Sequence, residues 1–191
     1  SSWHGTFVSG LVAGNPIASE GIFSVNWNAA MLPIRVLGKC GGFSTDLADA
    51  IRWAAGLSVP GVPGNPFPAK VINLSLGSEG ACVPSIEGAA VAAARQAGAL
   101  VVVAAGNDGN TVDSPANCPG AFGVAAIDQE GLKANYSNFG ASIKLSAPGG
   151  DGAFPIWSAS NTGLTGPLTN TYNTKIGTSF SSPMVAAAAS L

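Results

Sequence analysis

The chain has 191 residues, a length that fits one domain with a substantial core, so we expect a single domain over residues 1–191. Only 9% of its residues are charged, against about 25% in an average soluble domain, whereas 47% are apolar. The net charge of −2 comes with no basic stripe, which argues against nucleic acid as a partner, and the longest apolar run, 99–105, is too short for a membrane span. The composition predicts a soluble, tightly packed globular protein.

Five short apolar or β-branched runs predict the strands of one sheet. They are residues 31–37, 71–76, 100–105, 123–127 and 143–146. Most of these runs are continuous rather than alternating, which is typical of strands that are buried on both faces of a parallel sheet.

Two segments with helical spacing of their apolar residues lie between the predicted strands. The first, residues 45–57, opens with the capping candidates Ser44 and Thr45. The second, residues 85–97, is followed by Gly98, a residue type that commonly terminates helices. The alternation of strands and helices predicts an α/β fold with a parallel sheet, right-handed crossovers and helices on both faces.

Two long stretches are predicted to be irregular. Residues 56–69 contain four prolines and indicate an ordered surface loop, and residues 148–174 are polar with little periodicity. In an open parallel sheet, ligands bind outside the carboxyl ends of the strands. Functional side chains are therefore expected just after residues 76 and 105.

Two motifs near opposite ends of the chain contain candidates for acid–base and nucleophilic chemistry. His4, in His-Gly-Thr, is the only histidine and therefore the only imidazole base that the chain offers. Ser179 precedes an Ala-rich helical run over 184–191, so free backbone N–H groups of a helix start would lie beside its hydroxyl. Pro183 would then fall in the first turn, where a missing N–H costs nothing. Taken singly, His4 is as well explained as a structural residue and Ser179 as a helix cap.

Further candidates follow the predicted strands. Asn107, in Ala-Ala-Gly-Asn, is either a turn former or a side-chain donor to a developing oxyanion. Ser75, Leu76 and Gly77 end the neighbouring run, and the glycine leaves a backbone edge onto which an extended peptide could add as a strand.

The motifs HGT, SLG, AAGN and GTSxSxP, in this order, resemble those of the subtilisin-like serine proteases (subtilases). The phrases RVLGKCGG, IRWAAGL, VVVAAGN, YSNFG and APGG are similar to the secreted bacterial branch of that family. The resemblance covers nearly all 191 residues and implies a subtilisin-like three-layer sandwich in a secreted protein.

The resemblance also implies a role for each matching residue. His4 would be the general base and Ser179 the nucleophile of a serine endopeptidase that cleaves protein or peptide substrates through an acyl-enzyme. Asn107 would donate to the oxyanion together with the Ser179 N–H. The walls of the pocket for the residue before the scissile bond would be Ser75, Leu76 and Gly77 on one side and Ala104, Ala105 and Gly106 on the other.

The chain departs from the family pattern at the catalytic aspartate. In the family this residue lies in a D-[ST]-G segment before the histidine, and none precedes His4 here. Four other aspartates lie in the wrong places to replace it: Asp46, Asp49, Asp108 and Asp113. We therefore expect that the aspartate lies outside these residues, that the domain is truncated at both ends, and that the piece alone folds poorly and turns over about 10⁴-fold more slowly. Phe7 replaces a second family histidine that has no chemical role.

The three cysteines lack the spacing of a metal site and, taken alone, are as well explained as inert buried thiols. Within the resemblance, Cys40 and Cys82 lie in loops that follow neighbouring strands. We therefore expect a Cys40–Cys82 disulfide, worth about 4 kcal/mol in the chain-entropy model, with Cys118 left over.

The resemblance places Asp113 and Ser114 near the floor of the primary pocket, where a carboxylate could favour Arg or Lys in the substrate. At the level of sequence we prefer the alternative, a solvated loop aspartate. Subtilases often bind stabilising calcium, but no D-x-[DN]-x-[DN]-G run assigns a site here, and catalysis is expected to need no cofactor. A pro-segment in the parent chain is a further expectation from the family.

Other functional classes fit less well. The chain has no G-x-G-x-x-G or P-loop for a nucleotide and no G-x-S-x-G of an α/β-hydrolase. The serine-carboxyl peptidases use a glutamate base, against which His4 argues. A catalytically inactive pseudoprotease that serves as a binding module remains the alternative, because the aspartate is absent.

Overall fold

The computed structural model describes residues 2–16, 21–82 and 85–191. These residues form helices and strands in the following chain order: α1 (His4–Ala13), α2 (Ser44–Ala54), β1 (Val71–Leu74), α3 (Ile86–Gln96), β2 (Leu100–Ala104), β3 (Phe122–Ile127), β4 (Ile143–Pro148), β5 (Ile156–Asn161), β6 (Asn170–Lys175) and α4 (Thr178–Ala189).

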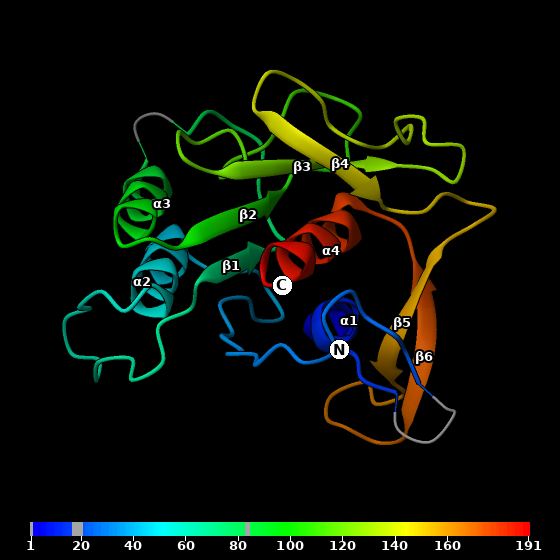
Figure 1. The fold of residues 1–191 in the computed structure, drawn as a ribbon, viewed down its shortest axis with the longest axis horizontal. Coiled ribbons are helices and arrows are strands. Elements are labelled where there is room, and N and C mark those ends of the chain that lie inside the picture. The colour runs from blue at the N-terminus through cyan, green and yellow to red at the C-terminus, as the bar shows by residue number, and fades with distance from the viewer. Residues whose placement is uncertain (1, 17–20, 83–84) are drawn as a thin grey trace.

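The central sheet has the strand order β1-β2-β3-β4, and every neighbouring pair is parallel (Figure 1). Its strands are four of the five apolar runs that the sequence analysis identified. Val71 pairs with Leu100, and Val102 pairs with Phe122. The predicted α/β class with a parallel sheet is therefore confirmed, and the carboxyl ends of β1 and β2 lie at one edge, where the candidate residues follow.

Helices cover both faces of this sheet (Figure 1). On β2, Val101 and Val103 pack into a core with α2 and α3, whereas the intervening Val102 packs against Val185 of α4 on the opposite face. Because successive strand residues point to opposite faces, a continuous apolar run serves both cores. The sequence prediction of helices on both faces of the sheet is correct.

Helix α1 lies on the outer side of α4, between α4 and the β5–β6 hairpin (Figure 1). Phe7 of α1 is completely buried against Phe180 of α4, with 4.7 Å between ring centroids. Ser158 of β5 donates to the Phe7 carbonyl at 2.7 Å. The buried position of Phe7 shows why an apolar ring is well accommodated there.

The prediction that residues 148–174 are irregular is wrong in part, because they contain β5 and all but the last residue of β6, which form an antiparallel hairpin. The sequence of β6, NTYNTK, has almost no apolar residues, so it lacks the hydrophobic pattern of a strand. Its pairing with β5 includes Trp157 stacked on Tyr172 at 4.2 Å between ring centroids. Cross-strand contacts of this kind, rather than an alternating pattern, form the hairpin.

The prediction of a strand over residues 31–37 is wrong. These residues belong to no sheet within the described part of the chain, and Met31, Ile34 and Leu37 are partly or largely exposed. A strand exists only where a neighbour takes up its backbone hydrogen bonds, and the described residues offer this segment none. Its apolar sequence alone could not reveal the missing neighbour.

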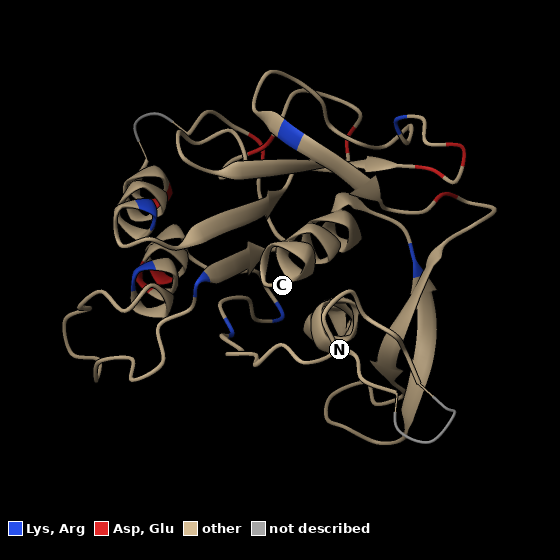
Figure 2. Ribbon diagram, in the orientation of Figure 1, with Lys and Arg blue, Asp and Glu red and all other residues tan. Residues whose placement is uncertain are grey.

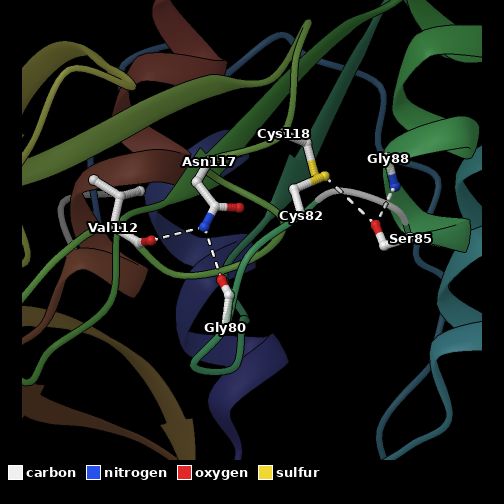
Figure 3. The surroundings of a disulfide bond; sticks show 7 residues. All are labelled: Gly80, Cys82, Ser85, Gly88, Val112, Asn117 and Cys118. Carbon is white, nitrogen blue, oxygen red and sulfur yellow. Dashed lines mark hydrogen bonds between the residues drawn. A yellow bond between two sulfur atoms is a disulfide. The ribbon is translucent and has the colours of Figure 1, made fainter.

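The disulfide prediction is also wrong. Cys82 is bonded to Cys118 (Figure 3). Cys40 is a free, exposed thiol. Cys82 follows β1 and Cys118 follows β2, so the exits of these two neighbouring strands bring the bonded cysteines together. Asn117 ties together the same two loops as the disulfide, since its Nδ2 donates to the carbonyls of Gly80 and Val112 at 2.8 and 2.9 Å.

The few charged residues are dispersed. Figure 2 shows the Lys and Arg positions on separate helices, strands and loops, with no basic segment. No helix in residues 2–16, 21–82 and 85–191 is long and apolar enough to cross a bilayer.

Candidate active site

Ser179 is the second residue of α4, and the start of this helix is tightly fixed. Gly177 is the residue that precedes the helix, and its N–H donates to the Gly149 carbonyl at 3.0 Å and to the Tyr136 hydroxyl at 3.2 Å. The Ser179 hydroxyl does not cap the helix but donates to the Ser75 carbonyl at 3.3 Å. The capping interpretation of Ser179 is therefore wrong, and its hydroxyl lies beside helix N–H groups that have no intrahelical partner.

Pro183 lies deeper in the helix than expected. It is the sixth residue of α4, not part of the first turn, so its missing N–H leaves the Ser179 carbonyl without its usual helical donor. The Ser75 hydroxyl fills this gap and donates to that carbonyl at 2.7 Å. Ser75 and Ser179 are thus joined in both directions, which locks the strand exit of β1 to the start of α4.

Asn107 follows β2 and is oriented by α4. Its Oδ1 accepts hydrogen bonds from the Thr178 N–H at 2.8 Å and the Thr178 hydroxyl at 3.1 Å. Thr178 is completely buried, so this anchor is rigid. With the carbonyl side of the amide used in this way, Nδ2 is left as a donor, and no described residue accepts a hydrogen bond from it. A fixed, unused donor beside Ser179 is what stabilisation of an oxyanion requires.

His4 is the first residue of α1 and is half-buried. Packing of α1 on α4 brings its ring to 5.7 Å from the Phe180 ring, next in sequence to Ser179. Burial, followed by the positive charge of Lys175, lowers the pKa of His4 below its ordinary value. The lowered pKa favours the neutral imidazole, the form that a base requires. Within the described residues, His4 makes no hydrogen bond to Ser179 and has no carboxylate partner.

A cavity of about 200 Å³, here called the primary pocket, opens beside Ser179. Its lining consists of Leu76, Gly77, Ala104, Gly106, Asn107, Asp108, Asp113, Thr178 and Ser179. The structure thus brings the nucleophile candidate, the amide candidate and four of the six predicted wall residues to one cavity. The other two wall residues do not line it: Ser75 lies behind Ser179, and Ala105 is completely buried.

Gly106 lies in the wall of the primary pocket that follows β2, where there is no room for a side chain. Its φ is +108°, a conformation that favours glycine, and a side chain there would overlap Asp113 Oδ2 and Asn138 Nδ2. Asn138 in turn fixes the next residues, because its Oδ1 accepts from the N–H groups of Asp108 and Asn110. The wall is therefore rigid before any substrate arrives.

Asp113 is not the solvated loop residue that we preferred from the sequence. Its side chain is only 9% exposed and lines the primary pocket. Burial raises the pKa of this carboxyl, and the negative charges of Asp108 and Glu79 raise it further.

The sequence analysis assigned no role to Thr178 or Tyr136. Thr178 was visible within the GTS motif as the neighbour of the nucleophile, but Tyr136, whose hydroxyl also donates to the Gly150 carbonyl at 2.8 Å, is remote in sequence. Across the described ranges, no group of three or more His, Cys, Asp or Glu side chains is arranged to hold a metal ion.

Comparisons with known proteins identify the family and the fold of the chain. The model of the subtilase family matches residues 1–191. The chain is 47% identical to an extracellular protease of Xanthomonas campestris pv. campestris, over all of this chain and 32% of that protein. The chain therefore spans about a third of the length of this curated relative.

Two solved structures are similar in fold. A protease from Pseudoalteromonas arctica has a TM-score of 0.95 and 44% identity, covering 100% of this chain and 58% of the other. A cold-adapted subtilisin-like serine proteinase has a TM-score of 0.74 and 28% identity, covering 98% and 59%. The architecture is therefore that of a subtilisin-like protease.

Proposed function

Because the chain belongs to the subtilase family, we propose that the protein is a serine endopeptidase that hydrolyses peptide bonds in proteins through an acyl-enzyme intermediate. The observation that carries this proposal is the cavity beside the start of α4, which Ser179 and Asn107 line together. A nucleophile and an oxyanion donor at one small cavity are suited to acyl transfer.

In the proposed mechanism, His4 removes the proton from the Ser179 hydroxyl as the oxygen attacks the substrate carbonyl. The tetrahedral intermediate collapses when His4 returns this proton to the amine of the leaving peptide, which breaks the C–N bond. Water, deprotonated by His4, then attacks the acyl-enzyme, and the proton passes to Ser179 as the carboxylic acid leaves. The lowered pKa of His4 supports its role as the base.

The negative charge of the tetrahedral oxygen would be stabilised by Asn107 Nδ2 and the Ser179 N–H. Both donors belong to groups that are already fixed, because Asn107 is anchored on Thr178 and Ser179 is part of α4. The positive end of the α4 dipole adds to this stabilisation. Donors that are oriented before the reaction need no reorganisation during it.

The Ser179 hydroxyl would have to leave the Ser75 carbonyl and turn to His4. The present bond is long, at 3.3 Å, so a rotation about the Cα–Cβ bond of Ser179 gives up little. Catalytic hydrogen bonds are often absent from unliganded sites and form in the substrate complex.

The carboxylate that orients His4 is proposed to come from outside these 191 residues. Two features support this: the chain spans about a third of its Xanthomonas relative, and β1 pairs with β2 on one side only within the described residues. The free edge of β1 and the unpaired apolar segment 31–37 offer a place for one more strand. A strand there would end near the same edge of the sheet as Ser75.

An extended peptide substrate is proposed to lie against the strand exits of β1 and β2, with the side chain before the scissile bond in the primary pocket. The free backbone near Gly77 and Gly106 suits the addition of a substrate strand.

The protein is proposed to be secreted, as the name of its Xanthomonas relative suggests for that protein, and the Cys82–Cys118 disulfide agrees with an oxidising environment. The proposed steps use only protein groups and water; a structural calcium ion remains unassigned, and a pro-segment in the parent chain remains an expectation.

Labelling by a fluorophosphonate, which reacts with activated serines, tests the proposal on the full-length protein. We expect labelling and hydrolysis of casein by the wild type, and loss of both in Ser179→Ala and His4→Ala. The matched control is Ser181→Ala, because the buried Ser181 hydroxyl on the same helix has no hydrogen-bond partner within the described residues. A stably folded wild type that binds peptides but is neither labelled nor active would establish the pseudoprotease alternative instead.

A further inference from the structure

The Asp113 carboxylate has no structural role that accounts for its place in the pocket wall. The backbone N–H of Asp113 donates to the Ala105 carbonyl, and its carbonyl accepts from Asn117, but no described residue donates to its side chain. Asp113 as a whole residue is 9% exposed, but its carboxylate oxygens are not among the fully buried side-chain atoms without a partner, so they face the open primary pocket that the residue lines. The protein keeps an uncompensated acid at the wall of its primary pocket.

Other negative charges around the Asp113 carboxylate make its ionised form less favourable. A second cavity, here called the outer pocket, has about 170 Å³ and shares Asp108 and Asp113 with the primary pocket, and it is also lined by Glu79. No Lys or Arg lines either cavity. Three carboxylates thus lie around the two pockets without a cation, and their mutual repulsion contributes to the raised pKa of Asp113.

The placement of Asp113 is held by its surroundings. Ser78 and Ser114 exchange backbone hydrogen bonds at 2.9 and 3.0 Å, and the Cys82–Cys118 disulfide closes the same pair of loops. The carboxylate also lies directly against the backbone of Gly106, along which the substrate is proposed to lie. These contacts hold the backbone of Asp113 in place, with its side chain at the wall of both pockets.

We infer that the primary pocket selects a lysine or arginine side chain as the residue before the scissile bond, and that Asp113 is the residue that pairs with its cation. This inference rests on the proposed function and names the substrate class of the same site. A cavity of about 200 Å³ is smaller than a typical pocket for a drug-sized ligand and suits a single side chain. The substrate cation would supply the hydrogen-bond donors that Asp113 lacks, in a site screened from water where such a bond is strong.

Asp113 and Glu79 differ in their place at the two pockets. Asp113 is buried and lines both cavities, whereas Glu79 lines only the outer pocket and is exposed. Glu79 therefore contributes a screened, longer-range attraction, and Asp113 the direct contact. This difference provides a matched pair of variants with the same change of charge.

The test measures kcat/KM of the full-length protein on peptides that differ only in the residue before the scissile bond: Arg, Lys, Leu or Glu. We expect cleavage of the Arg and Lys peptides to exceed that of the Leu peptide by at least about 10-fold. Asp113→Asn, which preserves the shape, should reduce the rates on Arg and Lys by about 10- to 100-fold and leave the rate on Leu unchanged or higher. Glu79→Gln should change the rates on the basic peptides by less than about 3-fold.

Cleavage of the Leu peptide by the wild type with no preference for Arg or Lys would overturn the inference while leaving the protease function intact. Equal losses in Asp113→Asn and Glu79→Gln would overturn the direct contact. If no peptide is cleaved and Ser179 is not labelled, the proposed function fails. Binding of benzamidine, a small amidinium compound, then tests the specificity of the primary pocket independently of catalysis. Calorimetric binding of this amidinium to the Ser179→Ala protein, lost when Asp113→Asn is added, supports the inference, and binding that ignores Asp113 refutes it.

Discussion

Replacement of Asn107 by aspartate separates the catalytic from the structural use of this side chain. The two bonds in which Oδ1 accepts from Thr178, at 2.8 and 3.1 Å, remain available to a carboxylate oxygen. The donor Nδ2 is replaced by an acceptor that carries charge. Asn107→Asp therefore keeps the anchor of the loop on α4 and removes only the group that is proposed to face the oxyanion.

We expect Asn107→Asp to reduce kcat by at least about 10²–10³-fold, equivalent to about 3–4 kcal/mol, with KM changed much less. This magnitude is the one known for the matching amide donor of a subtilisin and is carried over to this chain. The added negative charge opposes the oxyanion, so the loss should lie at or beyond the upper end of that range. KM depends mainly on contacts that the ground state already makes.

The free energy of unfolding should distinguish Asn107→Asp from a second variant, Asn107→Ala, of which only the alanine variant should be clearly destabilised. Asn107→Ala removes both acceptor bonds and leaves the Thr178 N–H unpaired, at about 1–3 kcal/mol, whereas the Thr178 hydroxyl keeps the Gly106 carbonyl as an acceptor. In Asn107→Asp the bonds remain, and attraction to the start of α4 contributes about 0.3–1 kcal/mol, which repulsion from Asp108 offsets. The free energy of unfolding should therefore stay near that of the wild type.

The assay combines steady-state kinetics, titration of active sites with a fluorophosphonate, and urea denaturation of the full-length protein. The expected pattern is a poorly active, stable Asn107→Asp and a poorly active, destabilised Asn107→Ala. A kcat of Asn107→Asp within about 3-fold of the wild type would refute the assignment of Nδ2 as an oxyanion donor. A large loss of stability in Asn107→Asp would instead refute the anchoring of Oδ1 on Thr178.

Three further predictions concern groups around the site. Lys175 lowers the pKa of His4, so Lys175→Met should raise this pKa and move the acid limb of the kcat/KM profile to higher pH, because the base is lost on protonation. The Cys82–Cys118 bond closes a loop of 36 residues, and Cys82→Ala with Cys118→Ala should cost up to about 4 kcal/mol in urea unfolding. Tyr136→Phe removes the hydroxyl that accepts from the N–H before α4 and donates to a neighbouring carbonyl, and should cost about 1–2 kcal/mol and lower kcat by several-fold.

Each of these predictions has a control in the same chain. Lys144→Met removes an exposed lysine of β4 and should leave the acid limb in place; a shift equal to that of Lys175→Met would indicate a general charge effect. Cys40→Ser alters the exposed free thiol and should leave the unfolding midpoint unchanged. For Tyr136→Phe, a normal kcat together with reduced stability would show that the hydroxyl supports the fold without positioning the nucleophile.

Local pattern was a good guide to the sheet and to the site motifs. The central strands β2 and β3 coincide with continuous apolar runs, because a strand covered on both faces must be apolar throughout, whereas the edge strand β4 is largely exposed and contains Lys144. Asn107 could be singled out because it follows a glycine at the end of a predicted strand, and Ser179 because it precedes a predicted helix. Their meeting at one cavity follows from the parallel order of the strands, which puts the exits of β1 and β2 at one edge.

The sequence by itself determined the α/β class, the family and the identity of the chemical groups, since these depend on short segments and on the residue types they contain. Only the tertiary structure decided that residues 31–37 form no strand within the described residues, that Cys82 bonds to Cys118, and that Asp113 lines the primary pocket. Each of these outcomes depends on which distant segment lies next to a residue. Backbone pairing, disulfide geometry and desolvation are properties of such neighbours, and no local pattern contains them.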